Sequence, residues 1–127
     1  MKAAIVILSD PKSGSDEALG RVFNALAAAY DFQQNGEEVA VLFQGAGTRW
    51  LAELTKAKHP AYELFNMVKD NVKGASCGCA AVFGATQDVQ SAGFDLIKNN
   101  PVPGTPGTPG LPSLRALISE GYSVLVF

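Results

Sequence analysis

The stretch Ala3-Ala4-Ile5-Val6-Ile7-Leu8 is a continuous apolar run of ordinary strand length, ended by Ser9-Asp10-Pro11. A strand with one face in solvent alternates apolar and polar residues, whereas a strand covered on both faces is apolar throughout. The run therefore predicts the central strand of a parallel sheet. It is too short to span a membrane, and no signal cleavage site follows it.

The residues after this run predict a helix and then a second strand. Ser13 or Ser15 is suited to cap the helix, and Gly36 is suited to end it. One face of this helix is apolar and carries Leu19, Val22, Phe23, Leu26 and Tyr30. Residues 38–43 then form a second apolar run. Strand, helix and strand with short connections make a βαβ unit, which pairs its strands in parallel through a right-handed crossover.

The rest of the chain continues the alternation of helices and strands. In chain order we expect helices at 50–54 and 62–70, a strand at 72–76, helices from about residues 80 and 88, a strand at 94–97, a loop at 101–112, a helix from Ser113 to Gly121 and a strand at 122–127. The 127 residues thus predict one α/β domain over residues 1–127. We expect a three-layer sandwich of about five mainly parallel strands with helices on both faces.

The composition is that of a compact globular protein, because 47% of the residues are hydrophobic and 17% are charged. The net charge is −2 and the cationic residues are scattered singly. This distribution offers no basic stripe for a nucleic acid and no cationic amphipathic face for a membrane. Two cysteines separated by one residue do not make the disulfide framework of a secreted protein, so we expect a cytoplasmic location.

The only two cysteines, Cys77 and Cys79, lie between a predicted strand end and a predicted helix start. Backbone N–H groups at a helix N-terminus favour the thiolate, which is the nucleophilic form, so both are candidate catalytic residues. The alternative is that both are small buried apolar side chains. A disulfide between them requires a sharply bent segment and would be easily reduced. Two thiolates and His59 do not complete a zinc site within one subunit, so we expect no metal.

The loops after the first two predicted strands should reach the same edge of the sheet as the cysteines. Each loop ends where a helix begins, which is a place where anions bind. The candidate binding residues are Ser9, Asp10, Lys12, Gln44 and Arg49, together with Gly78. The alternative is that these are ordinary turns and helix caps. Neither loop matches a phosphate-binding or dinucleotide-binding motif, and the single histidine argues against a hydrolytic triad.

The segment Cys79-Ala80-Ala81-Val82-Phe83-Gly84 is similar to a cysteine-alanine-x-alanine-phenylalanine-glycine pattern in the DsrE/DsrF-like family of small sulfur-relay proteins. The resemblance extends over the opening strand, the first helix and residues 111–127. It implies a five-stranded, largely parallel sheet, homo-oligomers from dimers to hexamers, and a cysteine that holds a persulfide. The match through Phe83-Gly84 selects Cys79 as that cysteine, whereas the match through the strand end selects Cys77.

Two departures from the family pattern concern the site. Relay members usually carry an arginine at the start of the helix after the cysteine, and this chain has none there. A histidine that often precedes the proline-serine-leucine stretch is Leu111 in this chain, which weakens a metal or acid–base role for the loop.

Three hypotheses on function follow from these observations. In the first, Cys79 or Cys77 takes a sulfur atom from a donor protein, holds it as a persulfide and passes it to an acceptor protein, with no cofactor. In the second, the protein is a non-catalytic oligomeric module that binds a small anion at the sheet edge. In the third, a disulfide between Cys77 and Cys79 acts as a redox switch.

Overall fold

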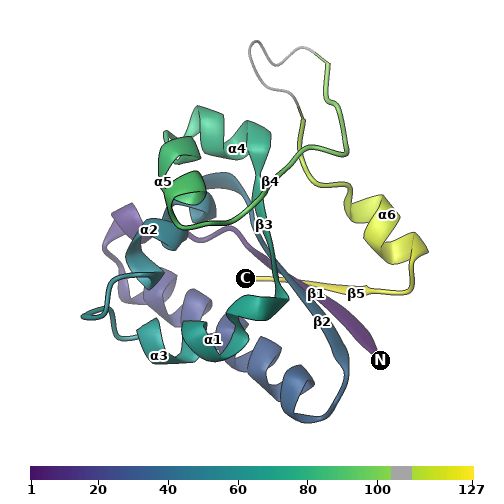
Figure 1. Ribbon diagram of the computed structural model, residues 1–127, viewed down its shortest axis with the longest axis horizontal. Helices are drawn as coiled ribbons and strands as arrows, with labels where there is room; N and C mark the ends of the chain where they lie inside the picture. The colour runs from purple at the N-terminus through teal and green to yellow at the C-terminus, as the bar shows by residue number, and fades with distance from the viewer. Residues whose placement is uncertain (104–109) are drawn as a thin grey trace.

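The computed structural model describes residues 1–103 and 110–127. Its core is a five-stranded sheet in which the strand order is β4-β3-β2-β1-β5 and every pairing between these strands is parallel. Figure 1 shows the sheet between its covering helices. The strands are β1 (Lys2–Ile7), β2 (Glu38–Phe43), β3 (Val72–Ser76), β4 (Leu96–Ile97) and β5 (Ser123–Val126). The predicted single α/β domain is confirmed.

The helices follow the expected order along the chain. They are α1 (Asp16–Gln34), α2 (Trp50–Leu54), α3 (Tyr62–Val68), α4 (Cys77–Val82), α5 (Thr86–Ser91) and α6 (Leu114–Ser119). Three short 3-10 turns connect them: η1 (Pro11–Ser13), η2 (Gly45–Arg49) and η3 (Lys69–Asn71). Ser15 caps α1 by accepting a hydrogen bond from the Ala18 N–H at 3.1 Å. Ser13 instead uses its hydroxyl to bond the Asp10 carbonyl oxygen.

One sequence-based expectation on the sheet is wrong. The first strand is not the central one, because β2 occupies the middle of the sheet and β1 lies between β2 and β5. Residues 3–7 are all buried, with Val6 the most exposed of them at 1%. Any strand with neighbours on both sides and layers on both faces shows this pattern, so an apolar run identifies an interior strand without giving its position.

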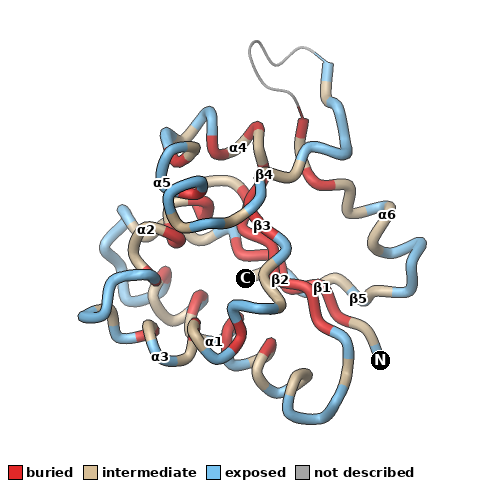
Figure 2. The backbone as a smooth tube through the Cα atoms, viewed as in Figure 1, coloured by how far each residue is buried: buried red, intermediate tan, exposed pale blue. Residues whose placement is uncertain are grey.

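The two faces of the sheet are covered very unequally. Side chains of Ile5, Val41 and Phe43 on one face belong to the large core that includes residues of α1, α2, α3 and α5. On the other face Ala40 and Leu42 pack against only a few residues, including Leu117 of α6. In Figure 1, α6 lies across the sheet from α1, α2 and α3, and Figure 2 shows that it is far less buried than β1 and β2.

The chain path explains this inequality. The connections from β1 to β4 all advance in one direction across the sheet, so their helices lie on one face, and the return from β4 to β5 lies on the other. A single helix of six residues, α6, is too short to cover that face. Large apolar side chains therefore remain exposed there and on α6, with Leu8 45%, Val126 57% and Ile118 61% exposed.

The segment predicted as a loop at 101–112 lies between β4 and α6. Residues 104–109 of it are outside the described residues. At its base, Asn100 and Leu111 exchange two backbone hydrogen bonds, of 2.8 and 3.0 Å, in an isolated antiparallel bridge. This bridge holds the two ends of the loop together beside the carboxyl edge of the sheet.

Candidate functional site

Both cysteines lie in the first turn of α4, which begins directly where β3 ends. The buried Ser76 is the N-cap, and its hydroxyl accepts a hydrogen bond from the Cys79 N–H at 3.2 Å. The sequence predicted a helix only from about residue 80, and glycine at position 78 is a poor helix former. The serine cap outweighs that preference. As a result, Cys77 and Cys79 are half-buried free thiols at the carboxyl edge of the sheet.

The N-terminal turn of α4 already has hydrogen-bond partners for part of its backbone. The Gly78 N–H donates to the Gly110 carbonyl oxygen at 2.8 Å, and the Cys79 N–H is taken by Ser76. These N–H groups carry much of the positive partial charge of a helix end. The sequence predicts that this partial positive charge stabilises a thiolate. Because two of the N–H groups already donate to other acceptors and α4 has only six residues, less of that charge is left to stabilise a thiolate.

The two thiols point away from each other. Residues i and i+2 of a helix are separated by about 200° around its axis, so their side chains do not meet. A disulfide requires Cβ atoms about 3.5–4.5 Å apart with side chains directed toward each other. Joining Cys77 to Cys79 would therefore require unwinding the first turn of α4. The sharp bend that a disulfide would require is absent, because Cys77 and Cys79 lie in a regular helical turn.

Asp10 and Arg49 are brought together, as the prediction of converging loops requires. The Arg49 guanidinium lies 3.2 Å from both carboxylate oxygens of Asp10 and donates to the Phe83 carbonyl oxygen at 3.1 Å. It also lies 5.4 Å from the centre of the Phe83 ring. The cation thereby ties the loops after β1 and β2 to the C-terminal end of α4. Its charge is compensated by Asp10, which leaves less of it for an anionic ligand.

The side chains of the other predicted binding residues do not join this ion pair. Ser9 accepts a 2.7 Å hydrogen bond from the Trp50 indole through its carbonyl oxygen. Lys12 is exposed and contributes its backbone N–H to the Asp10 carboxylate. Gln44 follows β2 in the same alternation as Ala40 and Leu42, so its side chain points to the sheet face that carries α6. The six candidate binding residues therefore do not form one pocket.

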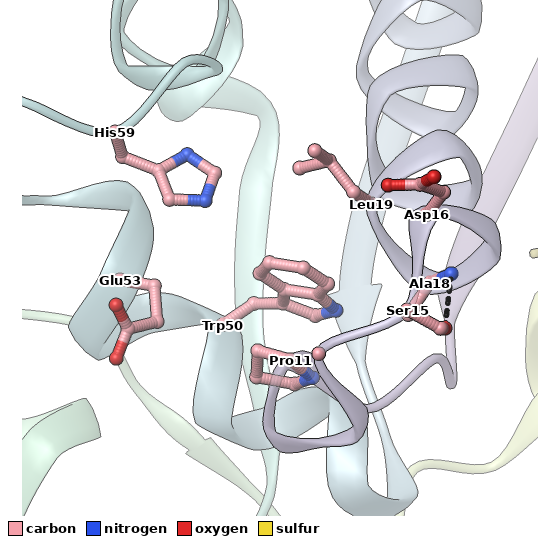
Figure 3. A pocket seen from close by; sticks show the side chains of 9 residues that line it. Pro11, Ser15, Asp16, Ala18, Leu19, Trp50, Glu53 and His59 are labelled. Carbon is pink, nitrogen blue, oxygen red and sulfur yellow. Dashed lines mark hydrogen bonds between the residues drawn. The ribbon is translucent and has the colours of Figure 1, made fainter.

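A small cavity of about 210 Å³ lies between α1 and α2, and the sequence analysis did not identify it. Figure 3 shows the His59 imidazole and the Trp50 indole on one side, with Leu19 and Asp16 of α1 on the other. The His59 and Trp50 rings pack edge to face at 5.9 Å. No cysteine is among the described residues that line this cavity.

His59 in this cavity is held in its neutral form. Its Nδ1 accepts a hydrogen bond from the Ala61 N–H at 3.1 Å, which an imidazolium cannot do. Burial lowers the pKa of His59 from its usual value near 6.5, the nearby Glu53 opposes this shift, and Lys56 adds to it. These contacts indicate that His59 is a structural residue in the connection between α2 and α3.

Residues that could bind a metal or cross a membrane are not found in the described part of the chain. Within residues 1–103 and 110–127, no three His, Cys, Asp or Glu side chains lie close enough together to hold a metal ion. Over the same ranges, no helix has both the length and the apolar character that crossing a bilayer requires.

Comparison with known proteins identifies a family and a fold. The model of the family described as DsrE/DsrF-like matches residues 1–127. A solved structure of a conserved protein of unknown function, BT1422 from Bacteroides thetaiotaomicron, is similar with a TM-score of 0.61 and 17% sequence identity. The match covers 99% of this chain and 94% of that one. At this identity the likeness concerns the fold alone. None of the curated proteins matches the sequence significantly.

Proposed function

The chain belongs to the DsrE/DsrF-like family, and from this premise we propose that it is a cytoplasmic sulfur-relay protein. One of the two thiols in the first turn of α4 carries a persulfide between a donor and an acceptor protein. The observation that carries the proposal is the placement of two free, half-buried thiols, Cys77 and Cys79, at the carboxyl edge of the sheet. Loops from several strands meet at this edge, which is where ligands reach open α/β sheets.

The chemistry needs no cofactor and no net oxidation. The cysteine thiolate attacks the terminal sulfur of a donor persulfide, a new S–S bond forms, and the donor leaves as a thiolate. The carrier then holds a persulfide. An acceptor thiolate attacks that terminal sulfur in turn, and the carrier cysteine leaves as a thiolate. One sulfane sulfur atom moves in each step, and both exchanges conserve electrons.

The divergence of the two thiols favours a carrier over a disulfide switch. A second thiol beside a persulfide would attack the inner sulfur, form a disulfide and release hydrogen sulfide. Cys77 and Cys79 are two residues apart on α4, so the helix holds the second thiol away from the first. A persulfide on either residue is therefore protected from this intramolecular loss for as long as the turn stays folded.

The relay function predicts a specific mass change. After brief incubation with a persulfide donor, we expect the wild-type protein to gain one sulfur atom that a thiol reductant removes. The gain should vanish in one of the two variants Cys77→Ser and Cys79→Ser and persist in the other, because a single thiol is the carrier. Intact-mass analysis measures both results.

The two single variants serve as matched controls for each other, since each changes one half-buried thiol in the same turn. Circular dichroism establishes that both are folded. Absence of any sulfur addition in the wild type, with both thiols slow to react with an alkylating reagent, would contradict the relay and favour the non-catalytic binding module.

The exposed apolar residues on the α6 side support a homo-oligomer as part of this proposal. We expect light scattering after size exclusion to give the mass of a dimer or a larger assembly. Val126→Lys should lower this mass, because a charge buried in an interface is costly and Val126 is 57% exposed on the thinly covered face. Met67→Lys, at a side chain of similar exposure (56%) on α3, is the control and should leave the mass unchanged. A monomeric wild-type protein would contradict the expectation.

A further inference from the structure

A surface hollow lies between the carboxyl end of β2 and the first turn of α6. Its volume is about 760 Å³, and its polar lining comes from Gln44, Asn99, Asn100, Ser113 and Arg115. Among the described residues that line it, Arg115 is the only charged one and none is acidic. Of these residues, the sequence predicted only Gln44 as a binding residue, because the others lie at turn and cap positions that carry no binding motif.

Gln44 is the most informative residue of this hollow. The residue is only 7% exposed, and its backbone bonds the Ile7 carbonyl oxygen and the Gly47 N–H. Its side-chain carboxamide has no hydrogen-bond partner among residues 1–103 and 110–127. Among the described residues no buried side-chain polar atom lacks a partner, so this carboxamide is open to solvent in the hollow and its donor and acceptor are available to an occupant. The alternation along β2 directs this side chain toward the hollow.

The groups left over in the hollow are hydrogen-bond donors. The Asn99 Oδ1 accepts from the Ser113 N–H at 2.9 Å, which leaves both Nδ2 protons available. The Ser113 hydroxyl oxygen accepts from the Ala116 N–H at 3.1 Å, which leaves its own proton available. Arg115 makes no ion pair within the described part of the chain. Donors together with one planar cation match the geometry of a carboxylate.

An adjoining hollow of about 160 Å³ extends this site under α6. It shares Asn99, Pro112 and Ser113 with the first hollow. Its own lining residues are Leu42, Ile97 and Leu117, together with the charged Lys73. Its lining is mostly apolar, so it suits a short hydrocarbon group. The combined shape therefore offers donors for a carboxylate at one end and apolar contact for a chain at the other.

We propose that these two hollows bind a small organic acid. Its carboxylate lies against Arg115, Gln44 and Asn99, and its apolar part extends over Leu42 and Leu117. The inference goes beyond sulfur relay and is independent of it, because no cysteine is among the described residues that line either hollow. Arg115 is the one cation among the described residues of the first hollow and Lys73 lines the second, so the carboxylate is expected at the planar guanidinium, which can bond both of its oxygens.

The test is a titration of the ¹⁵N-labelled 127-residue chain with hexanoate, followed by two-dimensional NMR. We expect saturable shifts of the Gln44 and Asn99 side-chain amides and of the Ser113 backbone amide. Arg115→Met keeps the length of the exposed side chain and removes its charge, so it should raise the dissociation constant at least about tenfold. Arg21→Met removes an exposed arginine of α1 and should leave the dissociation constant unchanged.

Three results would overturn the proposal. If the signals of these amides do not shift even at high hexanoate concentration, the hollow binds no carboxylate. Equal affinity for hexylamine would show an apolar groove without charge selection. If inorganic phosphate binds as tightly as hexanoate or more tightly, and Arg115→Met abolishes that binding, the hollow is a phosphate site. The mass test of the cysteines is unaffected by any of these outcomes, so failure of one proposal is distinguishable from failure of the other.

Discussion

Replacing Phe43 by alanine is expected to lower the free energy of unfolding by about 3–5 kcal/mol, a large part of the stability of a domain of this size. Phe43 ends β2, the middle strand, and is completely buried. Its ring packs edge to face against Phe65 at 6.5 Å, and Phe65 packs in the same way against Phe94 at 5.8 Å. The substitution therefore removes one member of an aromatic row that joins the sheet to α3.

Urea denaturation followed by the fluorescence of Trp50 measures this loss, because Trp50 is the only tryptophan and is buried. Phe43→Leu is the matched control: it retains an apolar side chain of similar volume and should cost less than about 1.5 kcal/mol. Equal losses for the two variants would show that the stability depends on the aromatic contacts rather than on filled volume.

Gly74→Ala is expected to destabilise the protein by about 3 kcal/mol or more, through the backbone rather than through a cavity. Gly74 has φ +141°, a conformation that other residues rarely adopt. A Cβ atom there would overlap the carbonyl oxygen of Asp95 and lie 2.9 Å from the carbonyl carbon. That oxygen also accepts a hydrogen bond from the Ala75 N–H. The added methyl group therefore pushes apart the segment that holds β4 beside β3.

Gly20→Ala provides a control in which the same substitution has the opposite sign. Gly20 lies within α1, and nothing stands within 4 Å of an added Cβ atom. Alanine is favoured over glycine in a helix by about 1 kcal/mol, so the variant should be more stable than the wild type. Thermal unfolding of both variants gives the comparison. A Gly74→Ala protein as stable as the wild type would mean that β4 shifts away at little cost.

The sequence predicted the elements well where a periodic pattern is long. The apolar run of β1, the amphipathic pattern of α1 and the run of β2 were located to within about a residue, and residues 38–43 coincide with β2. Prediction was poorer where elements are short. β4 was expected over residues 94–97 and consists of Leu96–Ile97, and α4 begins three residues before its expected start. Short elements are defined by contacts with neighbours more than by their own sequence.

Site prediction from sequence had a different limit. Cys77 and Cys79 were identified because cysteine at a strand–helix junction is a chemical signal in its own right. Asn99, Ser113 and Arg115 gave no such signal, since asparagine and serine at these positions are ordinary turn and cap residues. Their significance depends on lying beside Gln44, more than fifty residues earlier in the chain.

The sequence alone therefore determined the α/β class, the resemblance to the DsrE/DsrF-like family and the location of the thiols, because these follow from local patterns and residue chemistry. Only the tertiary structure decided that Asp10 neutralises Arg49 and that Gln44 faces α6. Both facts depend on strand order and on the alternation of side chains across the sheet. These are non-local properties, set when segments distant in sequence pack together.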